Sequence, residues 1–85
     1  MRLSGKLIKD TNIIKEKIVE INDDTLSYTD LLEACLIALC KELDIQVPIW
    51  LRKNTSEFVM HRKTSFLKDQ FMEDIIFDRF EMKVE

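Results

Sequence analysis

The segment Ser27–Leu43, "SYTDLLEACLIALCKEL", decides the fold of this chain because it carries the longest helical signal in the sequence. Its leucines recur at i, i+4, i+7 and i+11, the spacing of one helical face: Leu32, Leu36, Leu39 and Leu43. Ser27, followed three residues later by Asp30, has the pattern of a helix N-cap with an acidic first turn. We therefore predict a helix over Tyr28–Leu43 that forms the centre of the core.

Two further features of this helix bear on function. Ile37 interrupts its otherwise polar face, so an apolar side chain is expected at the surface there. Cys35 and Cys40 point about 140° apart on a helix, which prevents a disulfide between them. No CxxC motif or nearby histidine accompanies them, so we predict buried free thiols that pack as small hydrophobic groups.

The residues before the central helix predict a hairpin over Met1–Ile21. The first strand shows alternating apolar and polar residues, and Lys9–Asn12 supplies turn residues, of which Asn12 best tolerates a positive φ. The returning strand, Ile13–Ile21, has mixed faces. A bulge or an edge position would explain that mixture.

The residues after the central helix are less regular. Pro48 ends any continuation of the helix, and Asn54 with Glu57 has capping-box spacing. We expect a turn at Pro48–Lys53 and a helix from Thr55 to about Arg62, with one continuous bent helix as the alternative.

Two further expectations complete the chain. Ser65 reads as a cap for one more helical turn. Alternating residues predict a strand over Ile76–Val84.

These elements predict a single α+β domain spanning residues 1–85. The predicted sheet is small, three-stranded and mainly antiparallel, formed by the N-terminal hairpin and the C-terminal strand. It packs on one long central helix and one or two shorter helices. A chain of 85 residues has no room for a second core.

Composition argues against enzymes, metal sites and cofactors. The only histidine, His61, lies one turn after Glu57, and such an exposed pair is commoner than a general base. Gly5 is the only glycine, so a glycine-rich phosphate loop is excluded. The carboxylate pairs Asp23–Asp24 and Glu73–Asp74 supply too few ligands for a divalent cation. We expect no catalytic, cofactor-binding or metal-binding residues.

One charge asymmetry suggests an alternative function, weak nucleic-acid binding through the segment 50–66. Aromatic residues there alternate with four basic ones, as in many single-strand-binding surfaces: Arg52, Lys53, Arg62 and Lys63. "LCKELDIQVPIW" also has the order of elements of a helix-turn-helix, a helix, a tight break and a second helix, although Asp44 occupies the turn where glycine is favoured. The net charge of −3 disfavours the binding of nucleic-acid phosphates.

The segment around Trp50, "LDIQVPIWLRKNTSEF", has two interpretations. A tryptophan after a proline corner usually packs beneath it, but an exposed tryptophan would anchor a partner. Together with "FLKDQFMEDIIFDRF", this segment resembles a group of small bacterial proteins to which no activity is assigned, so the resemblance implies no function.

We predict a small, non-enzymatic protein-interaction module in a bacterial-type cytoplasm, partnered by itself as a homodimer or by another protein. No segment reaches the roughly 20 apolar residues of a membrane span, and no small-molecule substrate is evident. The strands carry apolar residues on both faces, and that surplus surface predicts an interface. The expected interface residues are Ile8, Ile37, Trp50, Ile75 and Phe77.

Overall fold

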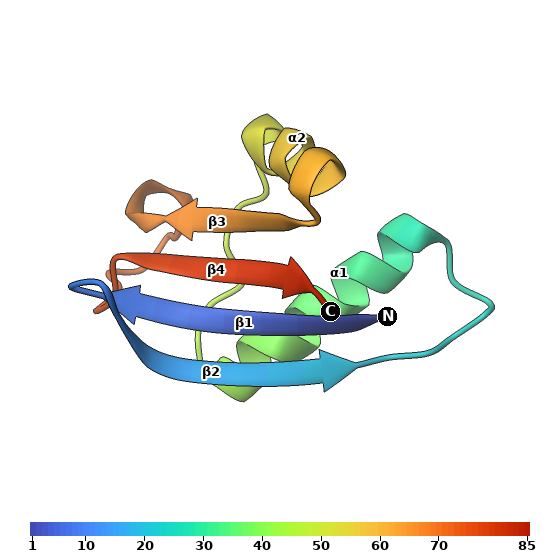
Figure 1. Ribbon diagram of the computed structural model, residues 1–85, viewed down its shortest axis with the longest axis horizontal. Helices are drawn as coiled ribbons and strands as arrows, with labels where there is room; N and C mark the ends of the chain where they lie inside the picture. The colour runs from blue at the N-terminus through green and yellow to red at the C-terminus, as the bar shows by residue number, and fades with distance from the viewer.

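The computed structural model describes residues 1–85 as one antiparallel sheet of four strands, two helices and one 3-10 turn (Figure 1). The order of the strands in the sheet is β2-β1-β4-β3. The elements, in chain order, are β1 (Arg2–Lys9), β2 (Asn12–Glu20), α1 (Tyr28–Leu43), α2 (Arg52–His61), β3 (Lys63–Leu67), η1 (Lys68–Gln70) and β4 (Arg79–Val84).

The central helix has the predicted bounds and the predicted cap. The Ser27 hydroxyl accepts a hydrogen bond from the Asp30 backbone N–H at 3.1 Å. The helix ends at Asp44, whose left-handed φ of 57° takes the role that glycine usually has at this point. Leu36, Leu39 and Leu43 are buried, which confirms the apolar stripe.

The N-terminal hairpin is confirmed, and the turn differs in detail. Asp10 and Thr11, with φ of 51° and 67°, form a two-residue turn, so Asn12 does not take the positive φ. Positive φ at both central positions matches the right-handed twist of the strands.

Strand β2 has both features that were expected to explain its mixed faces, a bulge and an edge position. The pairing shifts between Leu7, which lies opposite Lys15, and Ile8, which lies opposite Ile13. Ile14 is therefore an extra residue in a bulge. In addition, β2 is an edge strand.

The prediction of three strands is wrong by one, because Lys63–Leu67 is a strand and not a helical turn capped by Ser65. Thr64 and Phe66 alternate toward the core and are 3% and 0% exposed, which is the period of a strand. The final strand begins at Arg79, three residues later than predicted, because Phe77 turns into the core and leaves Ile76 outside.

The second helix begins at Arg52, earlier than the predicted Thr55. Residues 48–51 are not helical, so the alternative of one continuous bent helix over residues 48–62 is wrong. Asn54 is the third residue of this helix instead of its N-cap. Its side chain reaches back and accepts a hydrogen bond from the Leu51 backbone N–H at 2.9 Å. The predicted capping box is thus corrected: Asn54 has the role of the distal residue.

The molecule has two layers. Helix α1 crosses one face of the sheet, against β1 and β2, and α2 lies beside the edge strand β3 (Figure 1). The core between α1 and the sheet contains Leu3, Leu7, Phe66, Phe80 and Met82. The opposite face of the sheet is open and carries mostly charged residues, including the ion pair between Lys6 and Glu16 at 3.8 Å.

Candidate protein-interaction site

An apolar cleft of about 500 Å³ separates α1 from α2, and we call it the helix groove. The connection between the helices passes Pro48 and forms part of its lining. Seven of its eleven lining residues are hydrophobic, a composition typical of binding pockets. The eleven lining residues are Tyr28, Thr29, Leu32, Glu33 and Leu36 of α1, Val47, Pro48 and Trp50 of the connection, and Thr55, Phe58 and Val59 of α2.

Trp50 packs as expected for a tryptophan beneath a proline corner. Its ring centroid lies 5.9 Å from that of Phe58 and 5.7 Å from that of Phe66. Its indole N–H donates to the Thr55 hydroxyl at 2.8 Å. The indole therefore has its polar partner within the chain, while its ring lines the helix groove.

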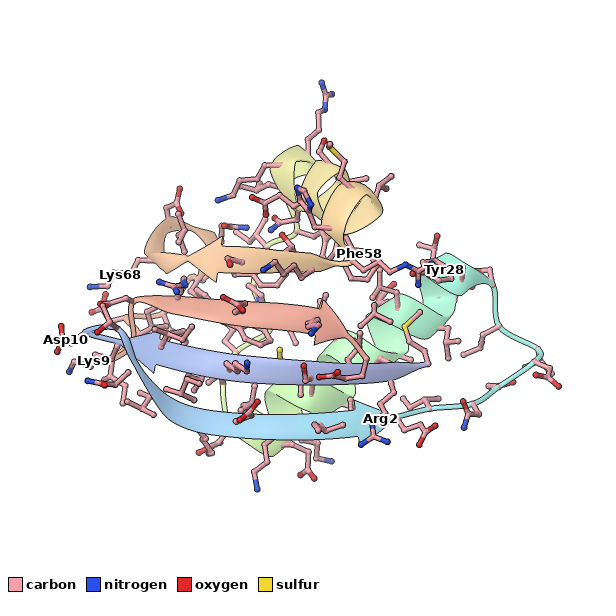
Figure 2. The ribbon with its side chains drawn as sticks, in the orientation of Figure 1. Arg2, Lys9, Asp10, Tyr28, Phe58 and Lys68 are labelled. Carbon is pink, nitrogen blue, oxygen red and sulfur yellow. The ribbon has the colours of Figure 1, made fainter.

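The rim of the helix groove exposes apolar side chains from both helices. Tyr28 is 58% exposed and Val59 is 77% exposed. Figure 2 labels Tyr28 at the start of α1 and Phe58, the neighbour of Val59, on α2. A contiguous apolar surface of this kind marks an interaction site more often than scattered exposed residues do.

One carboxylate is the only charge among the lining residues at neutral pH. Glu33 stands on the α1 wall, and it has no ion-pair partner, since the ion pairs of the chain are Lys6–Glu16 and Arg79–Glu81. The groove thus combines apolar walls with one free negative charge.

The outward face of α2 is both aliphatic and basic. Val59 lies seven residues after Arg52, and Met60 seven after Lys53, so each pair shares one stripe of the helix. Met60 is 75% exposed. Arg52 and Lys53 also form no ion pair within the chain.

The β3 edge of the sheet is partly covered by amide side chains. Asn54 donates to the Ser65 carbonyl at 3.0 Å, and Gln70 accepts from the Leu67 backbone N–H at 3.1 Å. The two amides bond to each other at 2.8 Å. Unpaired backbone groups on an edge strand attract other strands, and here side chains occupy two of those groups, the Ser65 carbonyl and the Leu67 N–H.

The β2 edge has free backbone groups, and its charges oppose self-pairing. Met1 and Ile21 exchange two backbone hydrogen bonds, so by antiparallel alternation Glu16, Ile18 and Glu20 direct theirs outward. Two-fold antiparallel pairing of β2 with itself, centred on any one residue from Lys15 to Ile18, sets Lys opposite Lys or Glu opposite Glu. Like charges directly opposite destabilise a sheet.

The five predicted interface residues do not form one surface. Ile8 and Phe77, at 6% and 3% exposure, are buried within the chain, so they cannot provide surplus apolar surface. Phe77 packs edge-on against Phe71, with centroids 5.5 Å apart. Ile75 lines a smaller, more polar cleft of about 400 Å³. Only Ile37 is well exposed, at 48%.

The four predicted nucleic-acid contacts separate into two pairs. Arg52 and Lys53 begin α2, whereas Arg62 and Lys63 follow its end, about 14 Å away by helical rise. Of the aromatic side chains in the segment 50–66, Phe58 and Phe66 are buried at 6% and 0% exposure and cannot stack on bases. Trp50 is partly buried, and His61 is exposed.

Glu57 and Asp23 each accept a hydrogen bond from a nearby threonine hydroxyl. The Glu57 carboxylate accepts from the Thr64 hydroxyl at 2.5 Å and makes no ion pair with the exposed His61. Asp23 accepts hydrogen bonds from the Thr25 hydroxyl and backbone N–H, which lower the pKa of its carboxyl group. Nowhere do three or more His, Cys, Asp or Glu side chains gather as metal ligands would.

Both cysteines are free and buried, as predicted. Burial raises the pKa of the Cys40 thiol to about 12. This thiol therefore stays protonated at neutral pH and is a poor nucleophile. Neither helix of the chain has the length and apolar character required to cross a membrane.

Sequence reasoning missed Tyr28, Glu33 and Val59 as site residues. The signal for Val59 is present in the sequence. Val59 follows Phe58 directly, about 100° further round the helix, so a helix that buries Phe58 directs Val59 away from the core. Comparison with family models, with curated proteins and with solved structures found no match for this chain.

Proposed function

We propose that this chain is a non-enzymatic protein-interaction module whose binding surface is the helix groove. The observation that carries the proposal is an apolar groove between two helices with exposed aliphatic and aromatic residues on both rims. Grooves of this type receive the apolar stripe of an amphipathic helix. The occupant is therefore an amphipathic helix that presents aliphatic side chains.

The charge of the groove specifies the occupant further. Glu33 is the single charged group of the lining and has no partner in the chain. A basic residue beside the aliphatic stripe of the occupant would pair with it and improve both association rate and selectivity. The proposal includes no catalytic step, and the two free thiols suit the reducing conditions of a cytoplasm.

Selection from a displayed library of amphipathic helical peptides tests this function. The enriched peptides should carry aliphatic residues at i, i+3 or i+4 and i+7 with flanking Lys or Arg. They should also change the fluorescence of Trp50, the only tryptophan, because it lines the groove.

Val59→Glu at the rim should weaken the selected peptides by about 100-fold. Ile18→Glu is the matched control, since Ile18 is a half-exposed aliphatic residue on β2, outside the helix groove. Peptides that bind the Val59→Glu variant as tightly as the parent chain, or that leave Trp50 emission unchanged, would rule out the groove as the binding surface.

A further inference from the structure

The outward face of α2 has the chemistry that the helix groove requires of its occupant. It is an amphipathic helix that exposes Val59 and Met60 at 77% and 75%, and Arg52 and Lys53 lie on the same stripes. Resting on the proposed function, we infer that the occupant is α2 of a second copy of this chain. The two copies form a two-fold dimer in which each α2 lies over the helix groove of the other.

The interface is complementary to itself. A two-fold dimer uses the same patch on both copies, so the patch must contain both the projecting group and the recess that receives it. Val59 projects from the wall of the helix groove in its own copy. In the dimer, the same side chain would fill the helix groove of the second copy. In the same patch, Glu33 supplies an unpaired negative charge, and α2 supplies two unpaired positive charges.

The two edges of the sheet offer no equivalent route to self-association. The Asn54 and Gln70 amides occupy two outward backbone groups of the β3 edge, and self-pairing of β2 centred on any residue from Lys15 to Ile18 sets like charges opposite each other. A specific interface of about 800 Å² per copy would cover about one seventh of the surface of 5684 Å². The helical side of the molecule is thus the remaining candidate for that area.

Sedimentation of the purified full chain tests the dimer directly. At concentrations up to about 500 µM, we expect a species of twice the 10.1 kDa chain mass. Val59→Glu should raise the dimer dissociation constant by about 100-fold, and Ile18→Glu should leave it unchanged. Far-UV circular dichroism should be the same for all three chains, and so should the unfolding midpoint measured well below the dimer concentration, because both substituted side chains lie at the surface.

A charge exchange distinguishes this dimer from any other. Glu33→Lys alone, and the pair Arg52→Glu with Lys53→Glu, should each weaken self-association by about 10-fold through like-charge repulsion. Mixed together, the two variants should form a heterodimer that is tighter than either homodimer, because both charge contacts across the two-fold axis become attractive. Native mass spectrometry resolves the three species.

A monomer at the highest concentration, or a dimer indifferent to Val59→Glu, overturns the inference. A mixture of charge variants without heterodimer enrichment overturns it as well. These outcomes leave the proposed function to the peptide selection, which is performed well below the dimer concentration. Failure of that selection with an intact dimer would instead restrict the groove to the second copy.

Discussion

At the scale of single residues, Gly5 sits where β1 passes directly beneath α1. A Cβ atom at this position would lie 2.8 Å from Leu39 Cδ2 and 2.8 Å from Phe80 Cε1. Both of those side chains are fully buried, and Phe80 is stacked on Phe66 at 5.4 Å, so the core has little freedom to move away. The only glycine of the chain is therefore required by close approach.

Gly5→Ala should lower the free energy of unfolding by about 2 kcal/mol through overpacking. The measurement is chemical denaturation, and a double-mutant cycle with Leu39→Ala provides the control. In the Leu39→Ala background the added methyl group has space, so its cost should become smaller and the two changes should not be additive. Strict additivity would show that Leu39 is not what opposes the methyl group.

The Cys40 thiol makes the stability of the fold depend on pH in the alkaline range. Its pKa is raised from 9.0 to about 12 in the folded chain, so above about pH 9 the unfolded state ionises while the folded state does not. The contribution of this thiol to the free energy of unfolding is fully present below the pKa of the unfolded state, and it is lost as the pH rises from that pKa to the pKa of the folded state. From about pH 8.5 to about pH 10, the parent chain should lose about 1 kcal/mol through this group.

Cys40→Ala should remove that part of the slope when urea unfolding is compared at both pH values. Its lower stability at neutral pH does not affect the comparison, because only the change with pH is compared. An identical slope in both chains would contradict the assigned origin.

At the scale of elements, a network of buried amides holds α2, β3 and η1 together. Asn54 and Gln70 are both 0% exposed. Asn54 donates to the Thr64 hydroxyl at 2.7 Å and to the Ser65 carbonyl, while its own oxygen accepts from Leu51 and Gln70. No buried side-chain nitrogen or oxygen lacks a partner, so the network supports the helix start and the sheet edge at once.

Asn54→Asp should therefore lower the free energy of unfolding by about 3 kcal/mol or more, although the two side chains have nearly the same shape. The carboxylate loses both donated bonds and places a negative charge against the Ser65 carbonyl. Asn12→Asp makes the same chemical change in an exposed turn, and it should have little effect. Equal losses in the two variants would show that the buried network adds nothing.

The elements also show how far the sequence could predict this structure. Helix α1 was predicted because its signals are local: a cap at Ser27 and a leucine stripe within one segment. Strand β3 has only five residues, and its pairing with β4, such as Phe66 with Phe80, joins residues distant in the chain.

The site was not predictable for a similar reason. Tyr28 and Val59 stand on the two rims of one groove although 31 positions separate them in the sequence. Surplus apolar residues led to the prediction of an interaction surface, but only the packing shows that Ile8 and Phe77 are buried and that Val59 is exposed.

At the scale of the whole molecule, the two edges of the sheet are protected by different means. Side-chain amides cover part of β3, whereas β2 keeps outward backbone groups and carries alternating charges. Three isoleucines of β2 are about half exposed: Ile13, Ile14 and Ile18. Charged residues between them are what prevents this edge from pairing with other chains.

Lys17→Ile should make the chain prone to aggregation, because it removes a central charge from an exposed, apolar edge strand. Light scattering at about 37 °C over a day should rise faster than for the parent chain. Lys53→Ile, which also replaces an exposed lysine by isoleucine but on α2, separates an edge-strand effect from a general loss of charge. Similar scattering from both variants would argue against the protective role of Lys17.

The position of the chain ends in the sheet has a mechanical consequence. Strands β1 and β4 are central, antiparallel neighbours, and Leu3 lies opposite Val84, so both ends leave the same side of the sheet (Figure 1). A force that pulls residues 1 and 85 apart would therefore load the hydrogen bonds between β1 and β4 one after another, as in opening a zip, and never all together in shear. The chain would yield to tension along its ends at low force even when it resists heat and denaturant well.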